Sequence, residues 1–179
     1  MVPRLHGFPD GLTDDELRPL RPIGMSVHDA AARTGDLLRR LGDAPGVRLL
    51  TGVRVTESAP PIGLAVSTPS HLLLVESVAW PYGVYTTTAR GDVLCDGIYI
   101  GQSVHPLLGS VRRLRRFSGR RRLGAVVVVH SSAAGIPSLP VSTPGGPAWL
   151  PPEKVCARIA GWLRRGHVVT YCQNDTNSW

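Results

Sequence analysis

The sequence has a single lysine and only three cysteines, which bear on the source of its positive charge and on the kinds of cysteine site it can form. Lys154 is the only lysine, so the formal net charge of +7 is carried almost entirely by arginine. Cys95, Cys156 and Cys172 are scattered and form no C-x-x-C pair. This distribution argues against a structural zinc site and against a disulfide framework, and at least one thiol must stay free.

Long apolar runs are also missing. No stretch reaches the about 18 residues that a membrane-spanning helix needs, and the N-terminal segment lacks the apolar centre of a signal peptide. We therefore expect a soluble, cytoplasmic protein with no membrane partner. The 179 residues are enough for one domain with a full core. We divide the chain into an irregular Pro-rich arm at 1–25, a single domain at 26–172 and a flexible tail at 173–179.

Two common catalytic patterns are absent as well. There is no G-x-S-x-G motif, so His130, Ser131 and Ser132 do not indicate a serine hydrolase. The pair Gly145-Gly146 lacks the lysine and the spacing of a phosphate-binding loop.

The most informative stretch is 62–80, which predicts a strand at 64–66, a tight turn, and a strand at 72–78. The second strand is apolar on both faces, as is typical of a strand covered on both sides. Glu76 interrupts it. A carboxylate in a central strand is costly unless it meets a cation or hydrogen-bond donors. Glu76 is thus a candidate functional residue, unless the strand simply emerges into solvent there or an arginine pairs with it.

The other periodicities predict the order helix, three or more strands, helix, strand, helix. Helices are expected at 27–41, 103–117 and 151–163, and further strands at 47–55, 85–89, 93–100 and 123–130. A helical turn at 13–18, an edge strand at 139–142 and a last strand at 167–172 complete the prediction. This order favours an α/β (α+β) domain with a mixed central β-sheet flanked by helices.

Five segments in this order resemble the motifs of a known family. They are Thr34-Gly35-Asp36, Thr51-Gly52-Val53-Arg54-Val55, Ile62-Gly63-Leu64-Ala65-Val66, the strand from Leu73 to Trp80, and Leu150-Pro151-Pro152-Glu153. The motif order over about 27–165 resembles the nuclease-related domain (NERD) family, whose core is similar to the restriction-endonuclease-like fold. The Glu-x-x-x-Trp spacing of Glu76 and Trp80 and the hairpin are the distinctive parts.

The resemblance implies a metal-dependent nuclease site, but this chain departs from it. In such a site an Asp and a Glu on adjacent strands hold divalent metal, and a Lys two residues on stabilises phosphate charge. Here Gly63 stands at the Asp position and Val78 at the Lys position, while Glu76 remains and Asp36 offers a second acid. We therefore expect a catalytically degenerate domain with no cofactor, acting as a nucleic-acid-binding or protein-interaction module.

Two alternatives stay open. An active DNA nuclease would bind Mg²⁺ or Mn²⁺ through Glu76 and Asp36, with Glu57 or Asp92 moved in as a further acid. Within this alternative, the acid at Asp36 need not be a metal ligand, because an ion pair with Arg40 four residues later would also account for it. The second alternative is a structural subunit of a larger assembly, with no nucleic-acid partner.

Arginines crowd the stretch 112–122 and form its strongest charge feature. They are Arg112, Arg113, Arg115, Arg116, Arg120, Arg121 and Arg122. Arginine is suited to bidentate contact with phosphate, so this run predicts DNA or another polyanion as partner. The alternative is a solvated helix end whose arginines complement the helix dipole. We expect Trp80, Trp149 and Trp162 to pack in the core rather than to stack on bases.

Overall fold

The computed structural model describes residues 24–57 and 60–165. Most of the predicted N-terminal arm, its helical turn at 13–18, the last strand at 167–172 and the C-terminal tail lie outside the described residues. The domain boundaries at 26 and 172 remain predictions.

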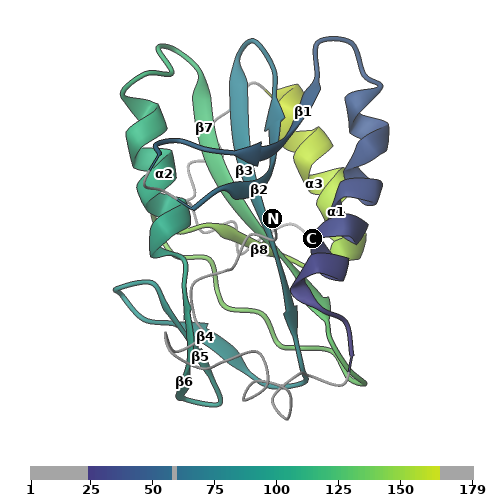
Figure 1. Cartoon of the computed structure of the whole chain (residues 1–179), viewed down its shortest axis with the longest axis vertical. Helices are drawn as coiled ribbons and strands as arrows, with labels where there is room; N and C mark the ends of the chain where they lie inside the picture. Colours follow the sequence, from purple (N-terminus) through teal and green to yellow (C-terminus); the bar gives the residue numbers. More distant parts are fainter. Residues whose placement is uncertain (1–23, 58–59, 166–179) are drawn as a thin grey trace.

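The central sheet has five strands, whose order across the sheet is the same as their order in the sequence (Figure 1). They are β1 (Arg48–Val53), β2 (Ile62–Ser67), β3 (His71–Trp80), β7 (Arg122–Ser131) and β8 (Ala148–Leu150). Strand β2 runs antiparallel to both β1 and β3, whereas β3, β7 and β8 are parallel to one another. The predicted mixed sheet and α/β class are confirmed.

Helices cover both faces of this sheet. On one face, α1 (Val27–Gly42) and α3 (Pro152–Arg165) lie over β3 and β7; on the other lies α2 (His105–Arg115) (Figure 1). Side chains of β3 alternate between the two clusters, with Leu73 in the α1/α3 cluster and Leu74 in the α2 cluster. Both faces of β3 are therefore apolar, as its sequence predicted. No helix in the described part of the chain is long and apolar enough to span a membrane.

A separate three-stranded sheet lies at one end of the molecule (Figure 1). It consists of β4 (Tyr85–Thr87), β5 (Asp92–Cys95) and β6 (Ile98–Ser103), all antiparallel. The prediction of one kinked strand over 93–100 is wrong. Asp96 and Gly97 have φ angles of 51° and 82°, which form a two-residue hairpin turn between two strands.

The predicted edge strand at 139–142 is also wrong. Among the described residues, the loop after β7 makes one isolated bridge, between Ser138 and Val84, and the edge of the main sheet is β8 instead. The start of α1 agrees with the sequence: Ser26 Oγ accepts from the Asp29 backbone N–H at 3.1 Å, and the Asp29 carboxylate accepts from the Ser26 backbone N–H at 3.2 Å.

Candidate functional site

Glu76 lies on the face of β3 that α2 covers, directly beside Gly63 of the neighbouring strand. Its Oε1 accepts a hydrogen bond from the Gly63 backbone N–H at 3.2 Å. A Cβ atom built on Gly63 would lie 3.7 Å from Glu76 Oε2, which is ordinary van der Waals contact. The two positions that the resemblance assigns to metal-binding acids are thus adjacent, although only one of them carries a carboxylate.

The Glu76 carboxyl group sits in an unfavourable place for a charge. The side chain keeps partial contact with solvent, yet burial raises the pKa of the carboxyl group from 4.5 to about 7, and the Gly63 hydrogen bond offsets only part of this effect. No basic side chain among the described residues contributes to this pKa. Neutralisation of Glu76 by an arginine, one of the explanations that the sequence left open, is therefore not seen.

A cavity of about 30 Å³ adjoins the Glu76 carboxyl group. Its lining is mainly apolar and includes Val78, Trp80, Leu107 and Trp149. Its polar lining includes Gln102, whose Oε1 accepts a hydrogen bond from the Trp80 indole N–H at 2.9 Å. This volume suits one water molecule and is far smaller than a nucleotide.

Asp36 does not share a site with Glu76. It lies on the exposed side of α1, and α1 covers the opposite face of the sheet, where Ser77 Oγ donates to Thr34 Oγ1 at 2.8 Å. Successive residues of a strand point to opposite faces, so Ser77 faces α1 and Glu76 faces away from it. The Glu76–Asp36 metal pair that the active-nuclease alternative requires is wrong for this reason. The helix pattern predicts Asp36 on α1 but does not indicate which face of the sheet α1 covers.

The partner of Asp36 also differs from the expected one. Arg39 Nη2 lies 2.5 Å from Asp36 Oδ1, so the ion pair spans three residues and does not involve Arg40. Asp36 lines an open pocket of about 410 Å³ between α1 and the chain after β7. The other residues that line it are Met25, Asp29, Ala32, Arg33, Ser131, Ser132 and Ala133.

Neither of the two acids that might have replaced the missing one lines the Glu76 cavity. Glu57 is exposed in the connection between β1 and β2. Asp92 is part of the hairpin between β4 and β5, where its carboxylate accepts from Thr88 Oγ1 at 3.4 Å. Within the described ranges, no three His, Cys, Asp or Glu side chains are grouped so that they could hold a metal ion.

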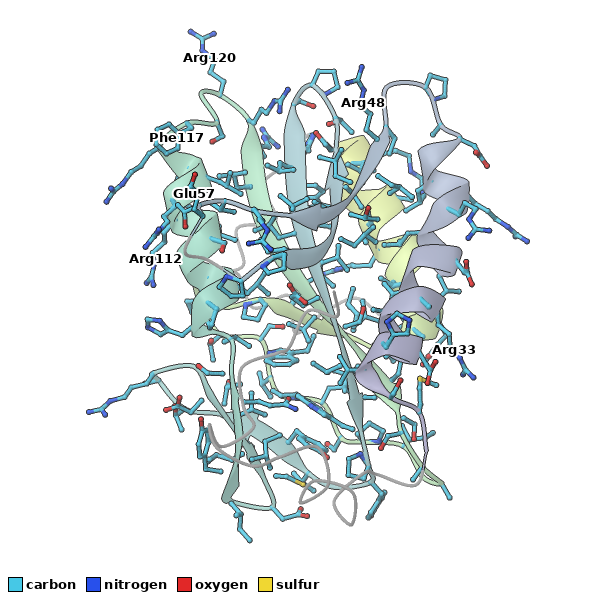
Figure 2. The ribbon with its side chains drawn as sticks, viewed as in Figure 1. Arg33, Arg48, Glu57, Arg112, Phe117 and Arg120 are labelled. Carbon is cyan, nitrogen blue, oxygen red and sulfur yellow. The ribbon has the colours of Figure 1, made fainter. Side chains whose placement is uncertain are left out.

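The arginines of 112–122 gather over the end of α2 and the turn that follows it, and we call this set the arginine surface. Figure 2 shows Arg112 and Arg120 projecting away from the sheet on this side of the molecule. Six of the seven are exposed, and Arg122 is half-buried. Arg113 Nη1 donates to Thr56 Oγ1 at 3.2 Å, and Arg121 Nε donates to the Pro69 carbonyl at 3.2 Å.

One buried polar cluster has no counterpart in the sequence predictions. Thr34 Oγ1 lies 2.8 Å from His130 Nε2 and accepts from Ser77 Oγ, so the cluster joins α1, β3 and β7. Burial lowers the pKa of His130, which favours the neutral ring. The feature of the sequence that could have indicated this cluster is Thr34, a threonine on the apolar face of a predicted helix. The cluster satisfies buried polar groups and anchors α1 to the sheet.

Comparison of the chain with family models, with curated proteins and with solved structures gives no match in any of the three.

Proposed function

We propose that this chain is a nuclease-related domain with a restriction-endonuclease-like core, that it has lost its catalytic set, and that it binds nucleic acid in the cytoplasm. The strand arrangement supports the core assignment: a helix, then an antiparallel β1-β2-β3 meander, then the parallel strand β7 beside β3. The position of Gly63 beside Glu76 also supports it, because the hairpin brings together the two positions at which the family resemblance expects acids.

Three observations support the loss of catalysis. Gly63 has no side chain to bind a metal ion, and Val78 is 5% exposed and packs in the apolar cluster under α2. Glu76, the remaining acid, has its pKa raised to about 7 by burial. Asp36 lies on the other side of the sheet and is paired with Arg39. One carboxylate beside a small apolar cavity is a poor ligand set for Mg²⁺, which requires several oxygen ligands in octahedral geometry.

The arginine surface is the observation that carries the binding function. We expect the protein to bind oligonucleotides, with an affinity that falls steeply as salt rises from about 50 to about 200 mM, because each arginine that neutralises a phosphate releases counterions. Fluorescence anisotropy with labelled single-stranded and duplex oligonucleotides measures this dependence. Absence of binding to both at the lower salt concentration would contradict the proposal.

Such a negative result would favour the alternative of a protein-interaction module or structural subunit. The candidate contact is then the end of the molecule with the small sheet, where several large apolar side chains are exposed. They are Tyr82, Val84, Ile98, Tyr99 and Ile136.

Restoring one carboxylate should restore metal binding. Gly63→Asp places a second carboxyl group beside Glu76 at a position where a Cβ atom meets no close contact. We expect Mn²⁺ to raise the melting temperature of this variant and not that of the unmodified protein, since a ligand stabilises only the form that binds it. Differential scanning fluorimetry with and without Mn²⁺ measures the shift.

Gly63→Asn is the matched control, because it has the same size and no charge. An equal Mn²⁺ shift in both variants, or none in Gly63→Asp, would contradict the proposal that Gly63 occupies a position at which the family has a metal-binding acid.

The unmodified protein should leave supercoiled plasmid intact in Mg²⁺ or Mn²⁺. Nicking that disappears in Glu76→Gln would establish the active-nuclease alternative instead.

A further inference from the structure

Phe117 is the one exposed large apolar side chain in 112–122, the stretch that carries the arginine surface. It lies two residues after the end of α2, where its backbone N–H donates to the Leu114 carbonyl at 2.9 Å, and its side chain is 83% exposed. Single exposed apolar side chains are common on protein surfaces and need no explanation by themselves. The neighbours of Phe117 are what distinguish it.

Arginines lie on both sides of Phe117 along the chain. Arg115 and Arg116 precede it, and Arg120 follows after a turn in which Gly119 has a φ of 56°. This turn is held to the rest of the fold, since Arg121 Nε and the Arg122 backbone N–H donate to the Pro69 and Ser70 carbonyls of the β2–β3 turn. Figure 2 shows Phe117 and Arg120 projecting from the same end of the molecule.

Negative charge is scarce around this ring. From Gly97 to Pro152 the sequence contains seven arginines and no Asp or Glu. Arg48 starts β1 at the same end of the sheet, because it pairs with Ser67 next to the β2–β3 turn. Glu57 is the acid that we place close to the arginine surface. It follows Thr56, which Arg113 contacts, and it appears beside α2 in Figure 2.

We propose that the arginine surface binds single-stranded nucleic acid, with the arginines on the phosphates and the Phe117 ring stacked on a base. This inference rests on the proposed function and names its ligand. Arginines alone attract the duplex at least as strongly, because its charge density is higher. An exposed aromatic ring favours the single strand, since only unpaired bases offer a free face for stacking.

The experiment compares Phe117→Ala with the unmodified full chain, using a labelled oligothymidine of about 15 nucleotides and a duplex of equal length at one salt concentration. We expect Phe117→Ala to weaken single-strand binding about 10-fold or more and to change duplex binding less than about 2-fold. Phe117→Trp should retain single-strand affinity, because tryptophan also stacks. Ile136→Ala is the matched control: Ile136 is also 83% exposed but lies in the loop between β7 and β8, away from the arginine surface.

The outcomes separate this inference from the proposed function. If neither nucleic acid binds, both fail. If both nucleic acids bind and Phe117→Ala leaves single-strand affinity unchanged, or weakens both equally, the stacking role is overturned while nucleic-acid binding stands. A loss in Ile136→Ala as large as that in Phe117→Ala would also overturn it, because the effect would not be specific to the arginine surface.

Discussion

Replacing Glu76 with glutamine should stabilise the protein above about pH 7 and have little effect at about pH 5. Burial raises the pKa of the Glu76 carboxyl group from 4.5 to about 7 in the folded protein. A difference of this size corresponds to about 3 kcal/mol in the free energy of unfolding. For a chain of this length we expect a rise in melting temperature of about 6–12 °C at alkaline pH.

The sign follows from proton binding. Between about pH 4.5 and about pH 7 the folded protein binds a proton at Glu76 that the unfolded chain has already released, so stability falls as pH rises through this window. Above it the carboxylate is charged in both states and the full cost of burying the charge remains. Glutamine is neutral throughout, and its amide oxygen can still accept the hydrogen bond from the Gly63 backbone N–H.

Thermal or urea unfolding at about pH 5 and about pH 8.5 measures the effect. Asp36→Asn is the control, because Asp36 is exposed and paired with Arg39 at the surface, where an ion pair contributes little. If Glu76→Gln changes stability equally at both pH values, or lowers it at the higher one, the charged Glu76 carboxylate does not destabilise the folded protein and the prediction is wrong.

Removing four arginines should abolish most of the nucleic-acid affinity. In the variant Arg112→Gln/Arg115→Gln/Arg116→Gln/Arg120→Gln, all four positions are exposed, so the fold should be unaffected. Each lost phosphate contact lowers the slope of log affinity against log salt by about 0.7–0.9, so the slope should fall by about 3. At about 50 mM salt we expect affinity to fall on the order of 100- to 1,000-fold.

An equal loss of charge elsewhere provides the control. Arg33, Arg40, Arg90 and Arg164 are exposed as well, and replacing all four with glutamine changes the net charge by the same amount. Arg33 lies on α1, on the opposite side of the molecule from α2 (Figure 2). If the two variants lose affinity equally, binding reflects overall charge, and the arginine surface has no special role.

The main sheet and its helices could be predicted because their patterns are local. The apolar run of β3 and the capping box of α1 depend on residues close together in the chain, and both agree with the structure. An Asp-Gly pair allows either a kink within one strand or a two-residue turn between two, so the local sequence does not distinguish them at Asp96-Gly97. The edge strand β8 is not predictable from its sequence, because a strand of three residues shows little periodicity.

The candidate site was predictable only in part. Glu76 was found because a charge in an apolar strand is a local anomaly, and its perturbed pKa agrees with that reasoning. Its relation to Asp36 was not predictable, since the face on which a helix packs depends on contacts that are distant in sequence. The hydrogen bond between Thr34 and Ser77 shows which face this is, and two hydroxyl residues far apart in the chain give no sign that they will meet.

The parallel pairing of β3 with β7 has a consequence for how the chain folds. Their paired residues, from His71 with Arg122 to Trp80 with Ser131, are about 50 positions apart in the chain. Closing so long a loop costs entropy before any contact between the two strands compensates for it, which slows folding. On the ribosome, the β2–β3 hairpin is complete well before β7 has been made. Until β7 is made, one edge of the apolar strand β3 is unpaired and can pair with another chain, which favours aggregation.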